Sequence, residues 1–245
     1  MRRSYRRVGT AAASLAAAMA TVAAVSGSAS ADPTAKAKYQ DALRAAASQS
    51  VHYVWRATEQ GKSWTLTVDT GKTSGSQVLE VRSGTTTEEL AVLRVGSTGY
   101  LRGNAAALTQ ALGLSAAQSR AYAGRWLSFP ASSATLSEFV RGLLNSDVAA
   151  EIQMTGPYTL GGTKVIAGQL AQAIEGTAST SSGTKVPIVL YVNATGTPHP
   201  LREITNPDAM SSAIRGTMTF SAWGETKDPR APAKSVPLIP LLPAH

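Results

Sequence analysis

The residues best suited to acid–base or metal chemistry lie far apart in this sequence of 245 residues. Its three histidines are His52, His199 and His245, and no two have the short spacing that places metal ligands on one helix or loop. Glu88 and Glu89 are adjacent, but neighbouring residues in a strand point to opposite faces and make a poor acid–base pair. We therefore predict no metal site and no paired-carboxylate catalyst.

Nucleophilic and phosphate-binding motifs are missing as well. The sequence has no cysteine, which excludes a Cys nucleophile, thiolate metal sites and disulfides. Serines are abundant, but none stands in a Gly-x-Ser-x-Gly elbow or in a convincing Ser-x-x-Lys helix. Gly162-Thr163-Lys164 and Gly183-Thr184-Lys185 lack the remainder of a phosphate-binding loop. We predict a protein that is not an enzyme and needs no cofactor. A hydrolase would require a polar cluster assembled from distant residues.

The first 31 residues have the three parts of a secretory signal. Four arginines among residues 2–7 form a basic start, residues 8–25 carry no charge, and Ala29-Ser30-Ala31 offers small residues for a cut before Asp32. The apolar stretch is rich in Ala, Thr and Ser, and is weak beside the roughly 20 strongly apolar residues of a membrane span. We predict a cleaved signal peptide and a secreted or cell-wall protein with no transmembrane anchor after cleavage.

The charge of the predicted mature chain is modest. The signal holds four of the 23 basic residues and none of the 15 acidic ones, so cleavage lowers the net charge from +8 to +4. A small charge spread along the chain does not predict nucleic-acid binding. Arg2-Arg3-Ser4-Tyr5 loosely matches a twin-arginine signal, but no cofactor that must be loaded before export is indicated, so the general secretory route is favoured.

The predicted mature chain opens with a helix followed by strands. Asp32 suits an N-cap and Pro33 the first turn, while Tyr39 and Leu43 share one face. From residue 51 the apolar period changes to two, which is typical of strands. The predicted strands of this half are residues 51–56, 64–69, 78–82, 89–95 and 100–102.

Helices are expected in the middle of the chain and strands again after it. Asn104, Ser115 and Thr135 are candidate N-caps, and the helix after Thr135, over residues 136–144, has the most continuous apolar stripe. The later predicted strands are residues 163–170, 173–177, 186–192, 201–204 and 216–223. This order predicts an α+β fold with one curved antiparallel sheet packed on helices.

Proline is concentrated in residues 226–245. Five prolines fall in the last 17 residues, and Pro237, Pro240 and Pro243 follow the period of three of a polyproline II helix. We predict one domain over residues 32–225 followed by an extended tail that lies on it. The alternative is that the tail is a docking peptide for a partner protein.

Three stretches of the sequence resemble a known family. They are residues 92–102 (VLRVGSTGYLR), residues 189–202 (VLYVNATGTPHPLR) and residues 220–224 (FSAWG). Together with the opening helix and the order of elements, they resemble the actinobacterial envelope lipoproteins of the LppX/LprG type over residues 35–225. The motifs are structural turns and strand ends, so they speak for the fold more than for a ligand.

The resemblance implies a LolA/LolB-like half-barrel, in which a strongly curved antiparallel sheet wraps around helices. Proteins of this type carry or sense lipids and acylated molecules in a hydrophobic cavity, without cofactors. The mycobacterial members carry a lipobox cysteine, whereas Ala29-Ser30-Ala31-Asp32 ends the signal here. We therefore expect a released protein rather than one anchored by an acyl chain.

These observations predict a carrier of a hydrophobic ligand, most simply a lipid, held between sheet and helices. The predicted lining residues are Trp55, Trp64, Leu66, Val68, Leu93, Phe139, Leu143 and Leu190. The same apolar face could instead be an ordinary filled core, and periodicity does not separate the two. The alternative function is an extracytoplasmic sensor or interaction module on the same scaffold that binds an envelope protein.

The predicted signal peptide has a direct test. N-terminal sequencing of the protein exported by a bacterial host should read Asp32-Pro33-Thr34, because the small residues before Asp32 direct the cut there. An exported protein that still begins at Met1 would contradict the prediction.

Overall fold

The computed structural model describes residues 32–59, 61–179, 185–206 and 215–242. The predicted signal peptide and His245 lie outside these ranges, so the cleavage site stays a prediction. None of the helices in the described part of the chain is long and apolar enough to cross a membrane.

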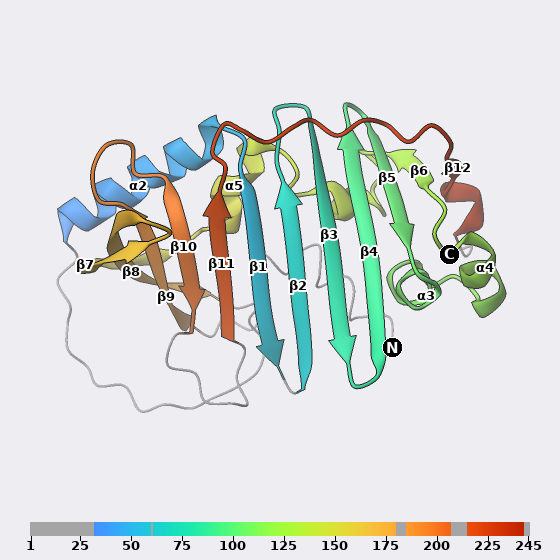
Figure 1. The fold of residues 1–245 in the computed structure, drawn as a ribbon, viewed down its shortest axis with the longest axis horizontal. Helices are drawn as coiled ribbons and strands as arrows, with labels where there is room; N and C mark the ends of the chain where they lie inside the picture. Colours follow the sequence, from blue (N-terminus) through green and yellow to red (C-terminus); the bar gives the residue numbers. More distant parts are fainter. Residues whose placement is uncertain (1–31, 60, 180–184, 207–214, 243–245) are drawn as a thin grey trace.

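The described residues form one sheet of 12 strands, in the order β12-β6-β5-β4-β3-β2-β1-β11-β10-β9-β8-β7. All neighbouring strands are antiparallel except β12 and β6. The sheet curls but does not close, because β12 and β7 remain its two ends (Figure 1). The strands are β1 (His52–Glu59), β2 (Lys62–Asp69), β3 (Ser74–Ser83), β4 (Thr86–Val95), β5 (Thr98–Gly103), β6 (Leu127–Pro130), β7 (Thr155–Ile166), β8 (Gln169–Ser179), β9 (Lys185–Asn193), β10 (Pro200–Thr205), β11 (Arg215–Ser221) and β12 (Val236–Pro237).

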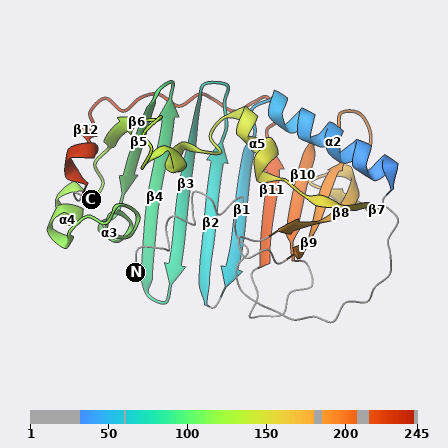
Figure 2. The same ribbon diagram turned by 180° about the vertical axis from the view of Figure 1, so that it is seen from behind.

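The helices are short and two of them lie on one face of the sheet. Figure 2 shows α2 and α5 in front of the strands, and we call this face the inner face. The α+β fold with one open, curved antiparallel sheet is the predicted one. The helical elements are α2 (Pro33–Ser48), α3 (Ala105–Leu112), α4 (Ala116–Tyr122), the 3₁₀ turn η1 (Ser137–Val140), α5 (Asn145–Glu151) and the 3₁₀ turn η2 (Ile239–Leu241).

Three of the predicted helix starts are confirmed by their caps. The Asp32 carboxylate accepts a hydrogen bond from the backbone N–H of Thr34 at 2.8 Å, at the start of α2. Asn104 caps α3 in the same way through the N–H of Ala107 at 2.9 Å. Ser115 forms a capping box at the start of α4. Each cap satisfies a backbone N–H that has no partner within its helix.

The predicted helix over residues 136–144 is wrong. Only Ser137–Val140 form a 3₁₀ turn, without a side-chain cap, and Gly142 then takes a left-handed conformation with φ of 82°. The N–H groups of Gly142 and Leu144 instead donate to the Asp147 carboxylate, at 3.1 and 3.3 Å, at the start of α5, a helix that the sequence did not predict. The apolar stripe therefore packs on the sheet as an irregular segment.

The predicted strand over residues 163–170 is also wrong in its extent. It is divided by a turn in which Ala167 and Gly168 both have positive φ, at 50° and 80°. β7 ends before this turn and β8 begins after it, so a hairpin occupies the region. An apolar run on both sides of the turn hid the reversal, because Val165 and Leu170 continue the same pattern. The sequence also gave no signal for the four-residue strand β6.

After β11 the tail runs along the ends of the central strands and reaches β6, at the opposite edge of the sheet from β7 (Figure 1). Thr226 donates its hydroxyl to the carbonyl of Thr70 at 2.7 Å, and Val236 pairs in parallel with Leu127 of β6. The N–H of Leu238 donates to the carbonyl of Ser128 at 2.9 Å, and the Leu238 side chain is fully buried. Residues 226–242 thus contribute both backbone pairing and core packing.

Close packing of the irregular segment on β3 gives a prediction at Gly75. A Cβ at this position would overlap the carbonyl oxygen of Leu143 and lie 2.9 Å from that of Asp69. We expect Gly75→Ala to lower the free energy of unfolding by about 1–3 kcal/mol, because the segment must move off the strand. Gly162→Ala is the matched control, since its Cβ would meet nothing within 4 Å. Urea unfolding of both variants checks this, and equal midpoints would contradict it.

Candidate functional site

One row of side chains crosses the inner face over eight neighbouring strands, from β4 to β8. Consecutive members are register partners, and all eight side chains are buried. Seven members are apolar and one is a glutamate, and we call the set the central row. Its members in order are Leu90, Leu79, Leu66, Trp55, Met218, Glu203, Leu190 and Ile174.

Seven of the eight predicted lining residues come together on this face. Trp55, Leu66 and Leu190 belong to the central row, and Val68 is the next inward residue of β2. The remaining three, Trp64 of β2 and Phe139 and Leu143 of the irregular segment, complete one continuous apolar cluster with them. Sheet and covering segment thus supply the predicted residues jointly.

Leu93 is not part of this cluster. Its register partners are Ser76 and Tyr100, whereas Val92 and Leu90 point inward from the same strand. Residues 90–93 are all apolar, so both faces of β4 carry apolar side chains and the sequence does not reveal which parity faces inward. The structure therefore places Leu93 on the outer face of the sheet.

The glutamate in the central row is the most unusual polar residue of the interior. Glu203 is 6% exposed, and the Thr205 hydroxyl donates to its Oε1 at 3.3 Å. Its Oε2 is buried without a hydrogen-bond partner among the described residues. Burial raises the pKa of Glu203 to about 8, opposed by the Thr205 hydrogen bond and reinforced by the negative charge of Glu151. The carboxyl is therefore mainly protonated at neutral pH.

A second buried carboxyl lies on the helix that covers this face. Glu151 of α5 is 7% exposed, and its Oε2 also has no hydrogen-bond partner in the described part of the chain. Burial raises its pKa to about 7, nearby Asp147 raises it further, and Arg141 lowers it. Because the charge of Glu151 contributes to the pKa of Glu203, the two carboxyls share one region of the interior.

Two buried tyrosines accompany the carboxyls. Tyr39 of α2 accepts a hydrogen bond from the N–H of Met154 at 2.6 Å and donates to the carbonyl of Ile152 at 3.2 Å. Burial raises the pKa of Tyr39 to about 12 and raises that of Tyr53 well above its usual value. The charges of Glu203 and Glu151 add to these shifts. Both phenols therefore remain neutral hydrogen-bonding groups.

Sequence reasoning missed both glutamates. Glu203 follows Arg202 in β10, and charged residues at consecutive positions do not show which one faces inward. Glu151 follows two alanines in a helix of seven residues that had not been predicted. The apolar alternation in the neighbouring strands β9 and β11 shows which residues of β10 face inward. This is the signal that could have indicated Glu203.

The described histidines have structural surroundings. His52 Nδ1 lies 2.8 Å from Asp69 Oδ1, and His199 stacks on Trp223 with ring centroids 4.9 Å apart. Burial lowers the pKa of His199. Among the described residues, no three His, Cys, Asp or Glu side chains are grouped so as to hold a metal ion.

The buried carboxyls predict a stability that falls as pH rises. Both have a pKa near 4.5 when unfolded and about 7 or 8 when folded, so the folded state binds more protons in this window. The free energy of unfolding should therefore decrease between about pH 4.5 and 8 and then level off. Glu203→Gln should remove much of this decrease, on the order of a few kcal/mol.

Urea unfolding at pH 5, 7 and 9 measures the effect. Glu175→Gln, an exposed glutamate of β8, serves as the control and should keep the slope of the unmodified chain. The same slope in Glu203→Gln as in the unmodified chain would contradict the prediction.

Comparison with known proteins identifies the fold. No protein-family model and no curated protein sequence matches the chain. Among solved structures, LprF from Mycobacterium bovis is 18% identical, matches 82% of this chain and 98% of its own, and superposes with a TM-score of 0.52. The Mycobacterium tuberculosis lipoprotein LppX is 17% identical, with 80% and 98% of the two chains matched and a TM-score of 0.49.

A LolA superfamily protein from Nitrosomonas europaea is more distant, at 14% identity over 80% of this chain and 94% of its own, with a TM-score of 0.27. The fold assignment rests on LprF, which shares the architecture over nearly its whole length. The chain therefore shares the fold of LprF, and the predicted open, curved antiparallel sheet packed on helices is confirmed.

Proposed function

We propose that this chain is a non-enzymatic carrier that binds a hydrophobic ligand, of the lipid class, against the inner face of its sheet, outside the cytoplasm. The observation that carries the proposal is the central row, which extends apolar side chains over eight strands of an open, curved sheet. Short helices and an irregular segment lie over this face (Figure 2).

Burial of apolar surface supplies enough free energy for this role. Each CH₂ group removed from water contributes about 0.8 kcal/mol, so one acyl chain reaches useful affinity without any specific polar contact. Binding of this kind needs neither a metal ion nor a catalytic group. The fold shared with LprF, and the resemblance of three sequence stretches to lipid-carrying envelope lipoproteins, support a lipid as the ligand.

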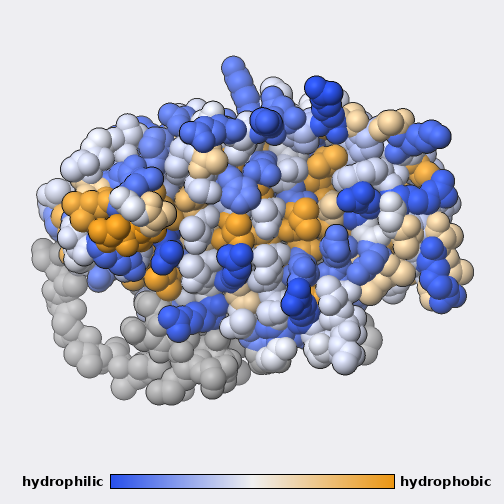
Figure 3. All heavy atoms as spheres, in the orientation of Figure 1, coloured by the Kyte–Doolittle hydropathy of each residue, from blue (hydrophilic) through white to orange (hydrophobic). Residues whose placement is uncertain are grey.

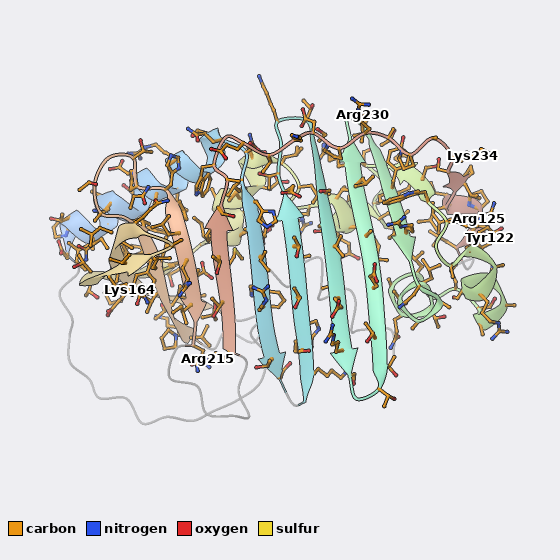
Figure 4. The ribbon with its side chains drawn as sticks, viewed as in Figure 1. Tyr122, Arg125, Lys164, Arg215, Arg230 and Lys234 are labelled. Atoms are coloured by element: carbon orange, nitrogen blue, oxygen red, sulfur yellow. The ribbon has the colours of Figure 1, made fainter. Side chains whose placement is uncertain are left out.

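A second candidate function is the interaction module, and one surface feature favours it. Val165 and Leu170 are register partners next to the β7–β8 turn and are 69% and 51% exposed. An apolar patch is visible at the left of Figure 3, where the β7–β8 hairpin lies, and β7 is the last strand of the sheet at this end. The Lys164 ammonium, labelled in Figure 4, lies 3.7 Å over the ring of Tyr191 nearby. An apolar pair beside an open sheet edge suits a protein partner.

Native mass spectrometry separates the two functions. The chain is purified from a bacterial host and measured before and after solvent extraction. An adduct of lipid mass that disappears on extraction supports the carrier. A clean mass, even after incubation with host membrane lipids, contradicts it and favours a filled core with a protein-binding surface.

The inner face gives a specific mutational prediction. Leu66→Glu places a carboxyl in the central row and should abolish the lipid adduct, because a buried carboxyl against an apolar ligand has a desolvation cost without a hydrogen-bond partner and a larger one when ionised. Thr67→Glu adds the same charge one residue later, on the outer face of β2, and should retain the adduct. Circular dichroism shows that both variants are folded. An unchanged adduct in folded Leu66→Glu would contradict the assignment.

A further inference from the structure

We propose that Glu203 and Glu151 form a polar subsite that holds the polar end of the hydrophobic ligand, and that this end is a hydrogen-bond donor without negative charge, a hydroxyl or an ammonium group. The inference rests on the proposed carrier function and specifies the chemistry of the ligand. The observation behind it is a pair of buried carboxyl groups, each with one oxygen that has no partner among the described residues.

Glu203 occupies a position at which a carboxyl group has a cost in folding free energy. Its register partners are Met218 on one side and Leu190 on the other, both buried. A leucine at 203 would complete an apolar row, whereas the carboxyl leaves Oε2 buried and unbonded. An unsatisfied buried polar group of this kind costs about 1–3 kcal/mol. A ligand that donates a hydrogen bond to Oε2 would remove this cost.

Glu151 approaches the same region from the opposite layer. It lies on α5, over the inner face, and its electrostatic influence reaches both Glu203 and Tyr53. The neighbouring phenol hydroxyls already have partners, since Tyr39 donates to Ile152 and Tyr53 to the carbonyl of Gly142 at 3.5 Å. These hydroxyls therefore leave the two glutamate oxygens without a partner among the described residues, and a ligand that displaces part of the cover can hydrogen-bond to them.

The charges around the subsite select the kind of polar end. Glu151 and Asp147 of α5 and Glu203 of β10 are acidic, and Arg141 is the cation that acts on Glu151. The tyrosines that face the carboxyls, one on α2 and one on β1, stay neutral. Once the carboxyls are ionised, an anionic carboxylate or phosphate meets like charge and an ammonium pairs with them, whereas a hydroxyl can hydrogen-bond to a carboxyl oxygen in either protonation state.

The basic side chains labelled in Figure 4 lie away from the middle of the sheet. Arg125, Lys164, Arg215, Arg230 and Lys234 lie along the rim of the molecule. Arg125 precedes β6, and the other four belong to strand ends, the hairpin or the tail.

The experiment compares three ligands with the same ten-carbon chain. Decanol, decylamine and decanesulfonate compete with a fluorescent apolar probe for the full chain at pH 6 and pH 9. Their charge states do not change between these two values. We expect decanol and decylamine to bind at least about tenfold more tightly than decanesulfonate at pH 9, a difference that corresponds to about 1.4 kcal/mol. The difference should be smaller at pH 6, where both carboxyls are protonated.

Substitution of the glutamates assigns the selectivity. Glu203→Gln should bring the three affinities at pH 9 to within about threefold of one another, because the amide cannot ionise. Glu151→Gln provides a second variant with the same expected direction, and the exposed Glu175→Gln should keep the selectivity of the unmodified chain.

Each result has a separate meaning. Equal affinities in the unmodified chain, or an unchanged ratio in folded Glu203→Gln and Glu151→Gln, overturn the subsite and leave the carrier function standing. Failure of the folded, unmodified chain to bind any of the three ligands overturns the carrier function, and the subsite with it.

Discussion

The inner face of the sheet imposes the constraint on which the rest of this molecule depends. A row of apolar side chains eight strands wide has to leave water, and no single described helix is long enough to cover it. α2 has 16 residues and α5 has seven.

The cover is completed by an irregular segment that carries Phe139 and Leu143. A non-helical segment can lie on an apolar face only if its backbone polar groups find partners elsewhere. Here Gln77 donates to the carbonyl of Phe139 at 2.8 Å, and Asp147 accepts from two N–H groups.

The two buried carboxyls oppose this constraint. An apolar interior accepts a carboxyl at low cost only when it is protonated or paired, and neither Glu151 nor Glu203 has a cationic partner within hydrogen-bonding distance among the described residues. The fold therefore favours their neutral form, and the free energy of unfolding decreases at higher pH, where they ionise. Residues that conflict with the packing around them are often found where a protein binds or reacts. This conflict is found at Glu203 in β10 and at Glu151 in α5.

Much of the fold could be predicted from local signals, because strands with alternating apolar residues and helices with N-cap residues have recognisable sequence patterns. Asp32, Asn104 and Ser115 sit at helix starts as expected, and the strands from β1 to β5 follow the alternation of apolar residues. The irregular segment was mistaken for a helix because its apolar spacing is helical. Its conformation depends on the left-handed backbone of Gly142 and on the hydrogen bond from Gly142 to the Asp147 carboxylate. The spacing of apolar residues does not report either of these.

The predicted lining residues have the same explanation. Where strands alternate, as at Trp55 and Leu66, the inner face could be assigned. Leu93 was misplaced because β4 is apolar on both faces, and the glutamates were missed because their burial depends on strands that are distant in sequence. The ligand itself is set by such tertiary arrangements of polar groups, which no local pattern records.

The pairing of β1 with β11 has a consequence for how the chain reaches its folded state. His52 lies opposite Ser221, so the middle of the sheet joins residues that are separated by most of the domain. During synthesis from the N-terminus, Tyr53 and Trp55 emerge long before their neighbours Phe220 and Met218. Pairings of such high sequence separation form slowly, and until then one edge of β1 stays open to incorrect partners. The chain has no cysteine, so no disulfide can link early strands to late ones. The middle of the sheet can therefore form only after the last strands have been synthesised.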